Sequence, residues 1–147
     1  MRLTHHADLA LRVLMYLALS GERRATIREI SEAFGISRNH LMKVAHKLAG
    51  FGYLESTRGS GGGIRLASPP GNIVIGRVVR DMEPDFGLVE CFRADNQCVI
   101  TPACALPRML DEALKAFLAT LDRYTLADLV TPKVAPEMAR ILGIASD

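Results

Sequence analysis

Residues 26–67, TIREISEAFGISRNHLMKVAHKLAGFGYLESTRGSGGGIRLA, contain the pattern on which the fold assignment depends. Thr26 and Glu29 fit a capping box, in which a hydroxyl and a carboxylate satisfy free backbone N–H groups at a helix start. That helix should stop near Gly35, and Ser37 is a suitable N-cap for a second helix that ends near Ala49, before Gly50. Two helices around so tight a connection predict a helix-turn-helix.

The second helix of this pair has two faces. Leu41, Val44, Ala45 and Leu48 form an apolar stripe, which leaves a polar face outward. Outward Arg, Asn and Lys side chains can donate hydrogen bonds to base edges and phosphates in a major groove. The candidates for such contacts are Arg38, Asn39, His40 and Lys43, with His46 and Lys47 further along the same face. For an isolated helix, an ordinary solvated face would be the alternative interpretation.

A basic, glycine-rich hairpin follows. Residues 53–57 and 64–67 are predicted strands, and residues 58–63 form a loop between them. A hairpin directly after a helix-turn-helix predicts a winged helix, in which Arg58 enters a narrow minor groove and Gly59 lets the backbone approach DNA. Loss of Arg58 should then weaken binding most at A·T-rich flanks. A nucleotide-type phosphate loop is disfavoured, because the Lys-Ser/Thr ending and the following helix are absent.

Charge is divided unevenly along the 147 residues. Residues 1–80 carry 12 Lys and Arg against 5 Asp and Glu, whereas residues 81–147 carry 6 against 11. This asymmetry favours an anionic partner for the first half only. Asp8 and Arg12 interrupt the apolar run near the N-terminus, which argues against a signal peptide, and no run is long enough to span a membrane. We therefore expect a cytoplasmic protein.

Further helices are expected at residues 6–19, ending at Gly21, at residues 76–82, and from about Leu106 onward. In the last of these the apolar residues are spaced 4, 3, 4, 3, a coiled-coil seam that predicts a two-fold homodimer. The seam residues are Leu110, Leu114, Phe117, Leu121 and Tyr124. Packing of this helix within its own subunit is the alternative.

The predicted fold class is mainly α with a small β-hairpin wing, that is, a winged helix-turn-helix plus a long dimerisation helix. Residues 1–82 should form the DNA-binding domain and residues 83–105 a cysteine-bearing loop. Residues 106–130 should hold the dimerisation helix and a short helix that Thr125 and Asp128 cap. Residues 131–147 should be a C-terminal tail, weakly ordered from about residue 134.

Three cysteines, Cys91, Cys98 and Cys104, lie within fourteen residues in the pattern Cys-x6-Cys-x5-Cys. An odd number of thiols in a reducing compartment indicates metal or redox chemistry rather than a disulfide. Iron–sulfur clusters tolerate such spacing, whereas zinc usually takes tighter pairs and a fourth ligand. Zinc and free thiols remain alternatives. A four-iron cluster would need one further ligand, and the candidates are Glu90, Asp95, Asp8, His5 and His6.

The assembled sequence resembles the NsrR group of nitric-oxide-sensitive repressors, within the iron–sulfur winged-helix regulators that also include IscR. The segments that carry the resemblance are residues 1–4, 35–43, 58–66, 88–91, 100–104 and 124–130. The resemblance implies a homodimer with a cluster in each subunit, typically 4Fe–4S, on Cys91, Cys98 and Cys104. It also implies that Asp8 of the partner subunit supplies the fourth ligand. A 2Fe–2S cluster with a His ligand near the third cysteine, as in IscR-like relatives, is not available to this loop, because no His follows His46.

The resemblance predicts a repressor, not an enzyme, that binds a pseudo-palindromic double-stranded DNA operator and releases it when nitric oxide reacts with the cluster. A 2Fe–2S cluster, an iron-status or redox-responsive regulator, and a zinc-stabilised repressor remain alternatives. A metalloenzyme is disfavoured, because the cysteines have no acid–base pair beside them and little chain is left for a substrate pocket.

Overall fold

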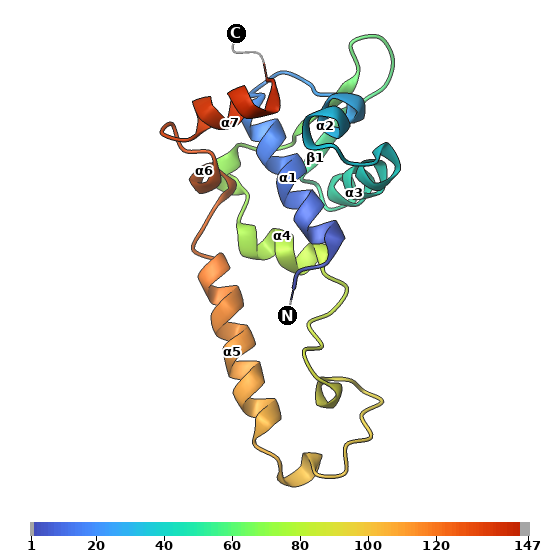
Figure 1. The fold of residues 1–147 in the computed structure, drawn as a ribbon, viewed down its shortest axis with the longest axis vertical. Coiled ribbons are helices and arrows are strands. Elements are labelled where there is room, and N and C mark those ends of the chain that lie inside the picture. Colours follow the sequence, from blue (N-terminus) through green and yellow to red (C-terminus); the bar gives the residue numbers. More distant parts are fainter. Residues whose placement is uncertain (1, 145–147) are drawn as a thin grey trace.

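The computed structural model describes residues 2–144. Figure 1 shows a helical body from which an arm projects, and the arm consists of the cysteine loop (residues 83–105) and helix α5, Leu106–Leu121. The core lies in the body around α1, His5–Leu19, whose Leu9, Val13 and Leu14 are almost fully buried. The fold class predicted from the sequence is confirmed.

Helix starts in the body follow the local capping signals. The Thr4 hydroxyl accepts a hydrogen bond from the Ala7 backbone N–H (3.2 Å) at the start of α1. Helix α2, Ile27–Phe34, begins with the predicted capping box of Thr26 and Glu29. Gly35 ends α2 in the left-handed conformation, at φ +63°, which a glycine adopts without steric cost.

Helix α3, Arg38–Gly50, differs from the prediction at both ends. Ser37 occupies the N-cap position, but its side chain makes no capping hydrogen bond. Gly50, predicted to follow the helix, is instead its last residue, while Gly52, at φ +81°, makes the reversal toward the wing. A glycine at a helix end can continue the helix when a second glycine close by provides the turn.

The wing is the antiparallel pair β1, Leu54–Thr57, and β2, Gly63–Leu66. A bridge between Ala25 and Ile64 joins this hairpin to the segment before α2. A Cβ atom added at Gly62 would lie 2.5 Å from a backbone oxygen of the hairpin, and one added at Gly63 would lie 2.7 Å from the Ala25 oxygen. Gly62 is therefore required by packing within the hairpin, and Gly63 by the close approach of the hairpin to the segment before α2.

Helix α4, Ile75–Met82, and the short helix α6, Leu126–Leu129, frame the point where the arm joins the body. The Ile75 N–H donates to the Tyr124 carbonyl (2.9 Å), and Arg80 makes two hydrogen bonds to Asp122 (2.6 and 2.7 Å). Hydrogen bonding from Arg80 lowers the pKa of the Asp122 carboxyl below its ordinary value. The residues that directly follow α5 are thus bonded to α4 by both backbone and side-chain hydrogen bonds.

Gly76 lies at the centre of this attachment. A Cβ atom there would overlap the Asp122 carboxylate and lie 2.9 Å from the Asp122 backbone nitrogen. We therefore expect Gly76→Ala to lower the free energy of unfolding by about 1–3 kcal/mol, as overpacking does. Gly71→Ala is the matched control, because its Cβ would meet no atom within 4 Å. Equal denaturation midpoints for the two variants would contradict this account.

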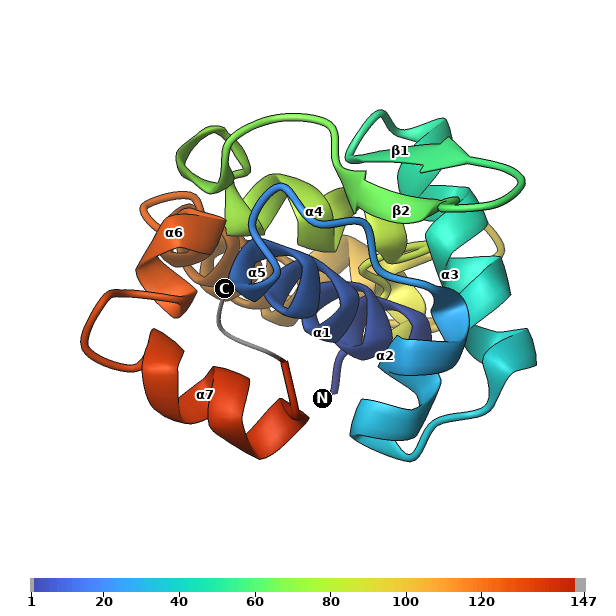
Figure 2. The same ribbon diagram turned by 90° about the horizontal axis from the view of Figure 1, so that it is seen from above.

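The C-terminal segment is more ordered than its sequence suggests. The sequence predicts weak order for residues 134–147, but Ala135–Leu142 form helix α7, which Gly143 ends at φ +66°. Residues 145–147, which are part of the same prediction, lie outside the described residues. Figure 2 shows α6 and α7 on one side of α1 and α3 on the other. Leu142 packs against the core and Ile144 is buried. The helix is stabilised by this tertiary packing, which a short amphipathic segment does not reveal on its own.

Helices α5 and α7 contribute no buried side chains, whereas the other helices of eight or more residues within residues 2–144 each contribute at least one. No helix in that range is both long enough and apolar enough to span a membrane.

Candidate DNA-binding surface and cysteine loop

The exposed face of α3 carries the four side chains that the sequence assigned to the major groove. Arg38, Asn39, His40 and Lys43 are all exposed, while Leu41, Val44, Ala45 and Leu48 are buried on the opposite face. The amphipathic pattern therefore predicted the orientation of the helix correctly.

Lys47 departs from that pattern. The sequence predicts it on the outward face, but it is half-buried, and its ammonium group donates to the Met82 carbonyl (2.8 Å) at the end of α4. Its nitrogen also lies 6.0 Å from the centre of the Phe51 ring. Its position at the edge of the apolar stripe, next to Leu48, is the sequence feature that could have indicated partial burial.

The first turn of α1 meets the first turn of α3. The His5 and His40 rings pack edge to face with their centres 5.7 Å apart. Asp8 lies one turn after His5 and forms an ion pair with Arg12 (2.9 Å), in which both side chains are roughly half exposed. A displacement at the start of α1 would therefore change the contact with His40 on α3, which is the recognition helix of the predicted helix-turn-helix.

The wing presents two arginines in different states. Arg58 and Gly59 are exposed at the hairpin turn, where Gly59 has φ +94°. Arg65 is instead paired with Glu55 (2.9 Å) and Glu22 (3.6 Å), so its charge is compensated within the protein. Of the two, Arg58 is the side chain that can meet an external phosphate or minor groove.

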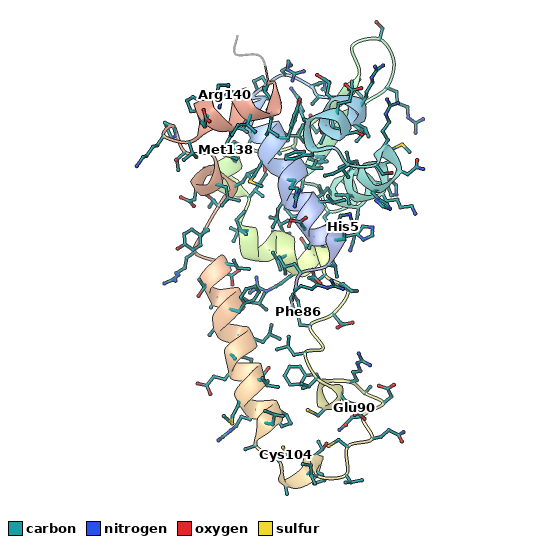
Figure 3. All side chains as sticks on the ribbon, in the orientation of Figure 1. His5, Phe86, Glu90, Cys104, Met138 and Arg140 are labelled. Atoms are coloured by element: carbon teal, nitrogen blue, oxygen red, sulfur yellow. The ribbon has the colours of Figure 1, made fainter. Side chains whose placement is uncertain are left out.

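The three cysteines lie along the arm as free thiols. Cys91 is half-buried in the 3-10 turn Glu90–Phe92, Cys98 is exposed, and Cys104 is half-buried directly before α5. Figure 3 shows Glu90 and Cys104 in the outer part of the arm, far from His5 at the start of α1. Asp8, on the first turn of α1, is therefore separated from the cysteines of its own subunit.

A small polar network holds the loop around Cys98. The Cys98 N–H donates to the Asn96 side-chain oxygen (3.0 Å), and the Thr101 hydroxyl donates to the Cys98 carbonyl (2.8 Å). The Glu90 carboxylate accepts from the Gln97 N–H (2.9 Å), which ties the first turn of the loop to its tip. Glu90, one of the candidate extra ligands, is thus already engaged in holding the loop.

The donor set suits a thiophilic centre. Three thiols on an irregular loop provide the soft ligands that iron–sulfur clusters take, and the loop backbone is free of long helices or strands that would hold the thiols apart. Among residues 2–144, no three His, Cys, Asp or Glu side chains are gathered in metal-binding geometry. The residues that could hold a cluster are therefore identified by their chemistry and by the loop that they share.

The inner side of the arm forms an apolar groove of about 750 Å³ against the body. It is lined by residues 2–4 and 83–89 and, from α5, by Leu110, Leu114 and Phe117. Three of the five residues of the predicted seam thus face this groove, and these three side chains are half-buried. Tyr124 is predicted in the same seam but lies beyond the end of α5, where its carbonyl accepts the bond from Ile75.

Comparisons with known proteins agree with this architecture. Residues 3–132 match the family model Rrf2, described as an iron-dependent transcriptional regulator. The chain is 54% identical over 136 residues to the HTH-type transcriptional regulator NsrR of Bacillus subtilis (strain 168), and the matched region covers 90% of this chain and 92% of that protein. It is 51% identical over 137 residues to the NsrR of Geobacillus kaustophilus (strain HTA426), covering 92% and 93%.

Solved structures show the same fold. A transcriptional regulator from Listeria innocua, 26% identical, superposes with a TM-score of 0.72 over 88% of this chain and 86% of that one. T. potens IscR, 24% identical, superposes with a TM-score of 0.71 over 88% and 86%. The relatives compared by sequence are named as transcriptional regulators, not as enzymes. The exposed recognition helix, the wing and the match over residues 3–132 together show that the chain belongs to the Rrf2 family of iron-dependent transcriptional regulators.

Proposed function

We propose that this regulator is a repressor whose operator binding is controlled by an iron–sulfur cluster, and that nitric oxide is its signal. The observation that carries the proposal is the presence, in one chain, of an exposed recognition helix and three free thiols on a single loop. The identity of 54% and 51% to regulators named NsrR supports the assignment of the signal.

The DNA partner is a double-stranded, pseudo-palindromic operator bound by a homodimer. Two recognition helices related by two-fold symmetry reach half-sites about 34–36 Å apart, one helical turn of DNA. Arg38, Asn39, His40 and Lys43 meet the major groove, and Arg58 with Gly59 meets the adjacent minor groove. Their exposure on α3 and on the wing supports these roles.

The cluster, most simply 4Fe–4S with 2Fe–2S as the alternative, is held by Cys91, Cys98 and Cys104, and Asp8 of the partner subunit is its fourth ligand. When bound, the cluster supplies iron atoms that react with nitric oxide. The chain supplies the coupling: Asp8 lies one turn from His5, and the His5 ring packs on His40 of the recognition helix. A carboxylate from the other subunit links the placement of the two DNA-binding heads to the state of the cysteine loop.

A second candidate is a regulator of the same architecture that responds to iron supply or to cluster loss. The description of the family as iron-dependent favours it. A zinc-stabilised repressor is the third candidate, and it would be colourless.

The test is an anaerobic absorption spectrum of the purified protein before and after nitric oxide, with operator binding measured in the same sample. We expect a broad brown absorption that bleaches as DNA is released. A coloured protein whose DNA affinity ignores nitric oxide but follows iron removal would support the iron-status regulator. A colourless, zinc-containing protein that binds DNA would overturn the cluster altogether.

Asp8→Ala tests the fourth ligand. We expect the variant to lose its visible absorption at a lower dose of nitric oxide and to release the operator at that lower dose, because a site left with three thiolate ligands is more labile. Arg12→Ala is the matched control, since it breaks the same exposed ion pair, worth about 0–1 kcal/mol, but keeps the carboxylate. If Asp8→Ala holds the same cluster and releases DNA at the same dose as the wild type, Asp8 is not a ligand.

Lys43→Ala tests the DNA surface. If the exposed ammonium group meets a phosphate, its loss should weaken binding to all sequences alike and reduce the slope of log affinity against log salt by about 1. Lys133→Ala removes the same charge from an exposed turn before α7 and should change neither quantity. A loss confined to the operator sequence would instead assign Lys43 to a base edge.

A further inference from the structure

The end of α4 bonds to three other parts of the DNA-binding head through three consecutive residues, which we call the α4 junction (residues 81–83). The Met82 carbonyl accepts from the ammonium group of Lys47 on α3 (2.8 Å). The Glu83 carboxylate accepts from the backbone N–H of Thr4, the N-cap of α1 (2.7 Å). The recognition helix and the first helix therefore both bond to adjacent residues.

The wing is attached at the same place. The Tyr53 hydroxyl, directly before β1, donates to the Asp81 carboxylate (2.5 Å), and Arg77 lies 3.9 Å from the same carboxylate. Burial and the bond to Asp81 raise the pKa of Tyr53 above its ordinary value, so the phenol remains a donor at physiological pH. All three contacts link residues that are far apart in the sequence.

Lys47 is well suited to this contact. The last carbonyls of a helix have no partner within the helix, and a cation is favoured there by the helix dipole. The Lys47 side chain is half-buried and its ammonium group is bonded to the Met82 carbonyl, whereas Arg38 and Lys43 are exposed. Its role is therefore distinct from DNA contact.

The junction is also the root of the cysteine loop. Pro84 follows Glu83 directly, and residues 83–89 run along the groove toward Cys91. A displacement of the cysteine loop would therefore move the Glu83 carboxylate and the Met82 carbonyl first. These are the two groups that accept hydrogen bonds from α1 and α3.

We propose that Lys47 is a positioning residue that transmits the state of the cysteine loop to the recognition helix through the Met82 carbonyl. The inference rests on the proposed function for its signal, but the mechanical link is a property of the chain itself. The proposal implies two separate connections from the cysteine loop. Lys47 couples the loop to α3, and the Thr4–Glu83 hydrogen bond couples the loop to α1.

The link is tested first without any cluster, by hydrogen exchange on the full-length apoprotein. Pro84→Gly loosens the root of the loop by removing the fixed φ of proline. We expect it to speed exchange of the amides at residues 44–50 by about 2- to 30-fold, the range for coupling through a packed network. In the Lys47→Met background, Pro84→Gly should leave the exchange rates of residues 44–50 unchanged. Amides in the first turn of α1 should still exchange faster, because the Thr4–Glu83 bond remains.

The second readout is operator affinity of the cluster-loaded protein before and after nitric oxide. In the wild type we expect a ratio of about 5- to 150-fold, the usual range for coupled sites. Lys47→Met should keep tight binding before treatment and reduce that ratio at least severalfold. Lys47→Arg should retain the ratio, because it keeps a donor and a charge, and Lys133→Met is the control for net charge.

The outcomes separate the two proposals. The positioning role is wrong if Pro84→Gly changes amide exchange at residues 44–50 equally in the wild-type and the Lys47→Met backgrounds. It is also wrong if Pro84→Gly does not change that exchange in the wild-type background. If the exchange result holds but wild-type affinity ignores nitric oxide, the positioning role stands and the proposed signal is wrong.

Discussion

Leu114→Glu on α5 is expected to convert the proposed dimer into monomers and to weaken operator binding by about 100-fold or more. A monomer binds a single half-site and loses the gain in effective concentration that a second, linked half-site provides. Leu114 lies in the middle of the apolar row that lines the groove, between Leu110 and Phe117. Leu114 is half-buried in the single chain, and in the proposed dimer an ionised carboxylate at this position would be buried without a partner, which is strongly unfavourable. Sedimentation velocity and operator titration measure the two effects.

The control for this prediction is Ala113→Glu. Ala113 is exposed and does not line the groove, so a charge there should leave both the proposed dimer and DNA affinity unchanged. If Ala113→Glu dissociates the dimer and Leu114→Glu does not, the subunits meet through the exposed face of α5, and the apolar row packs within its own subunit. That result would favour the intrasubunit alternative for the 4-3-4-3 seam.

Cys98→Ala is expected to abolish the visible absorption of anaerobically purified protein and with it the response of DNA binding to nitric oxide. Cys98 is the exposed member of the three cysteines, so its thiol has no packing role in the body. The denaturation midpoint of the apoprotein should therefore stay close to wild type, since exposed substitutions usually change stability by less than about 0.5 kcal/mol. A large loss of cluster without a loss of fold is the result that identifies a ligand.

Val99→Ala is the neighbouring control, because Val99 is 92% exposed and carries no ligand atom. It should keep the wild-type spectrum and the wild-type response. A Cys98→Ala protein that retains its colour and still releases DNA with nitric oxide would exclude Cys98 from the cluster site. A colourless wild type with bound zinc would exclude the cluster itself.

Local sequence signals predicted much of the fold because they act over a few residues. The capping box of Thr26 and Glu29 and the turn at Gly35 appear at the predicted positions, and the strands of the hairpin begin and end within one residue of theirs. Each depends on hydrogen bonds or backbone conformations within about five positions along the chain. The same locality explains why the spacing of Cys91, Cys98 and Cys104 is enough to group them on one loop.

The wrong predictions have the opposite origin. Gly50 continues α3 because Gly52 makes the turn. Tyr124 leaves the seam because its carbonyl pairs with Ile75, and residues 135–142 fold because Leu142 and Ile144 find the core beside α1. For Tyr124 and for residues 135–142 a contact with another part of the chain outweighs the local preference, whereas for Gly50 a second glycine two residues away provides the turn.

The amino-acid pattern therefore establishes the winged helix-turn-helix, the outward face of α3 and the set of thiols, since periodicity and spacing express themselves locally. Tertiary packing alone assigns Lys47 to Met82, 35 residues away, and Arg80 to Asp122, 42 residues away. It also turns the apolar row of α5 toward a groove. These placements depend on how separate helices pack against one shared core, and no periodicity within a single helix specifies which carbonyl or carboxylate a long side chain will meet.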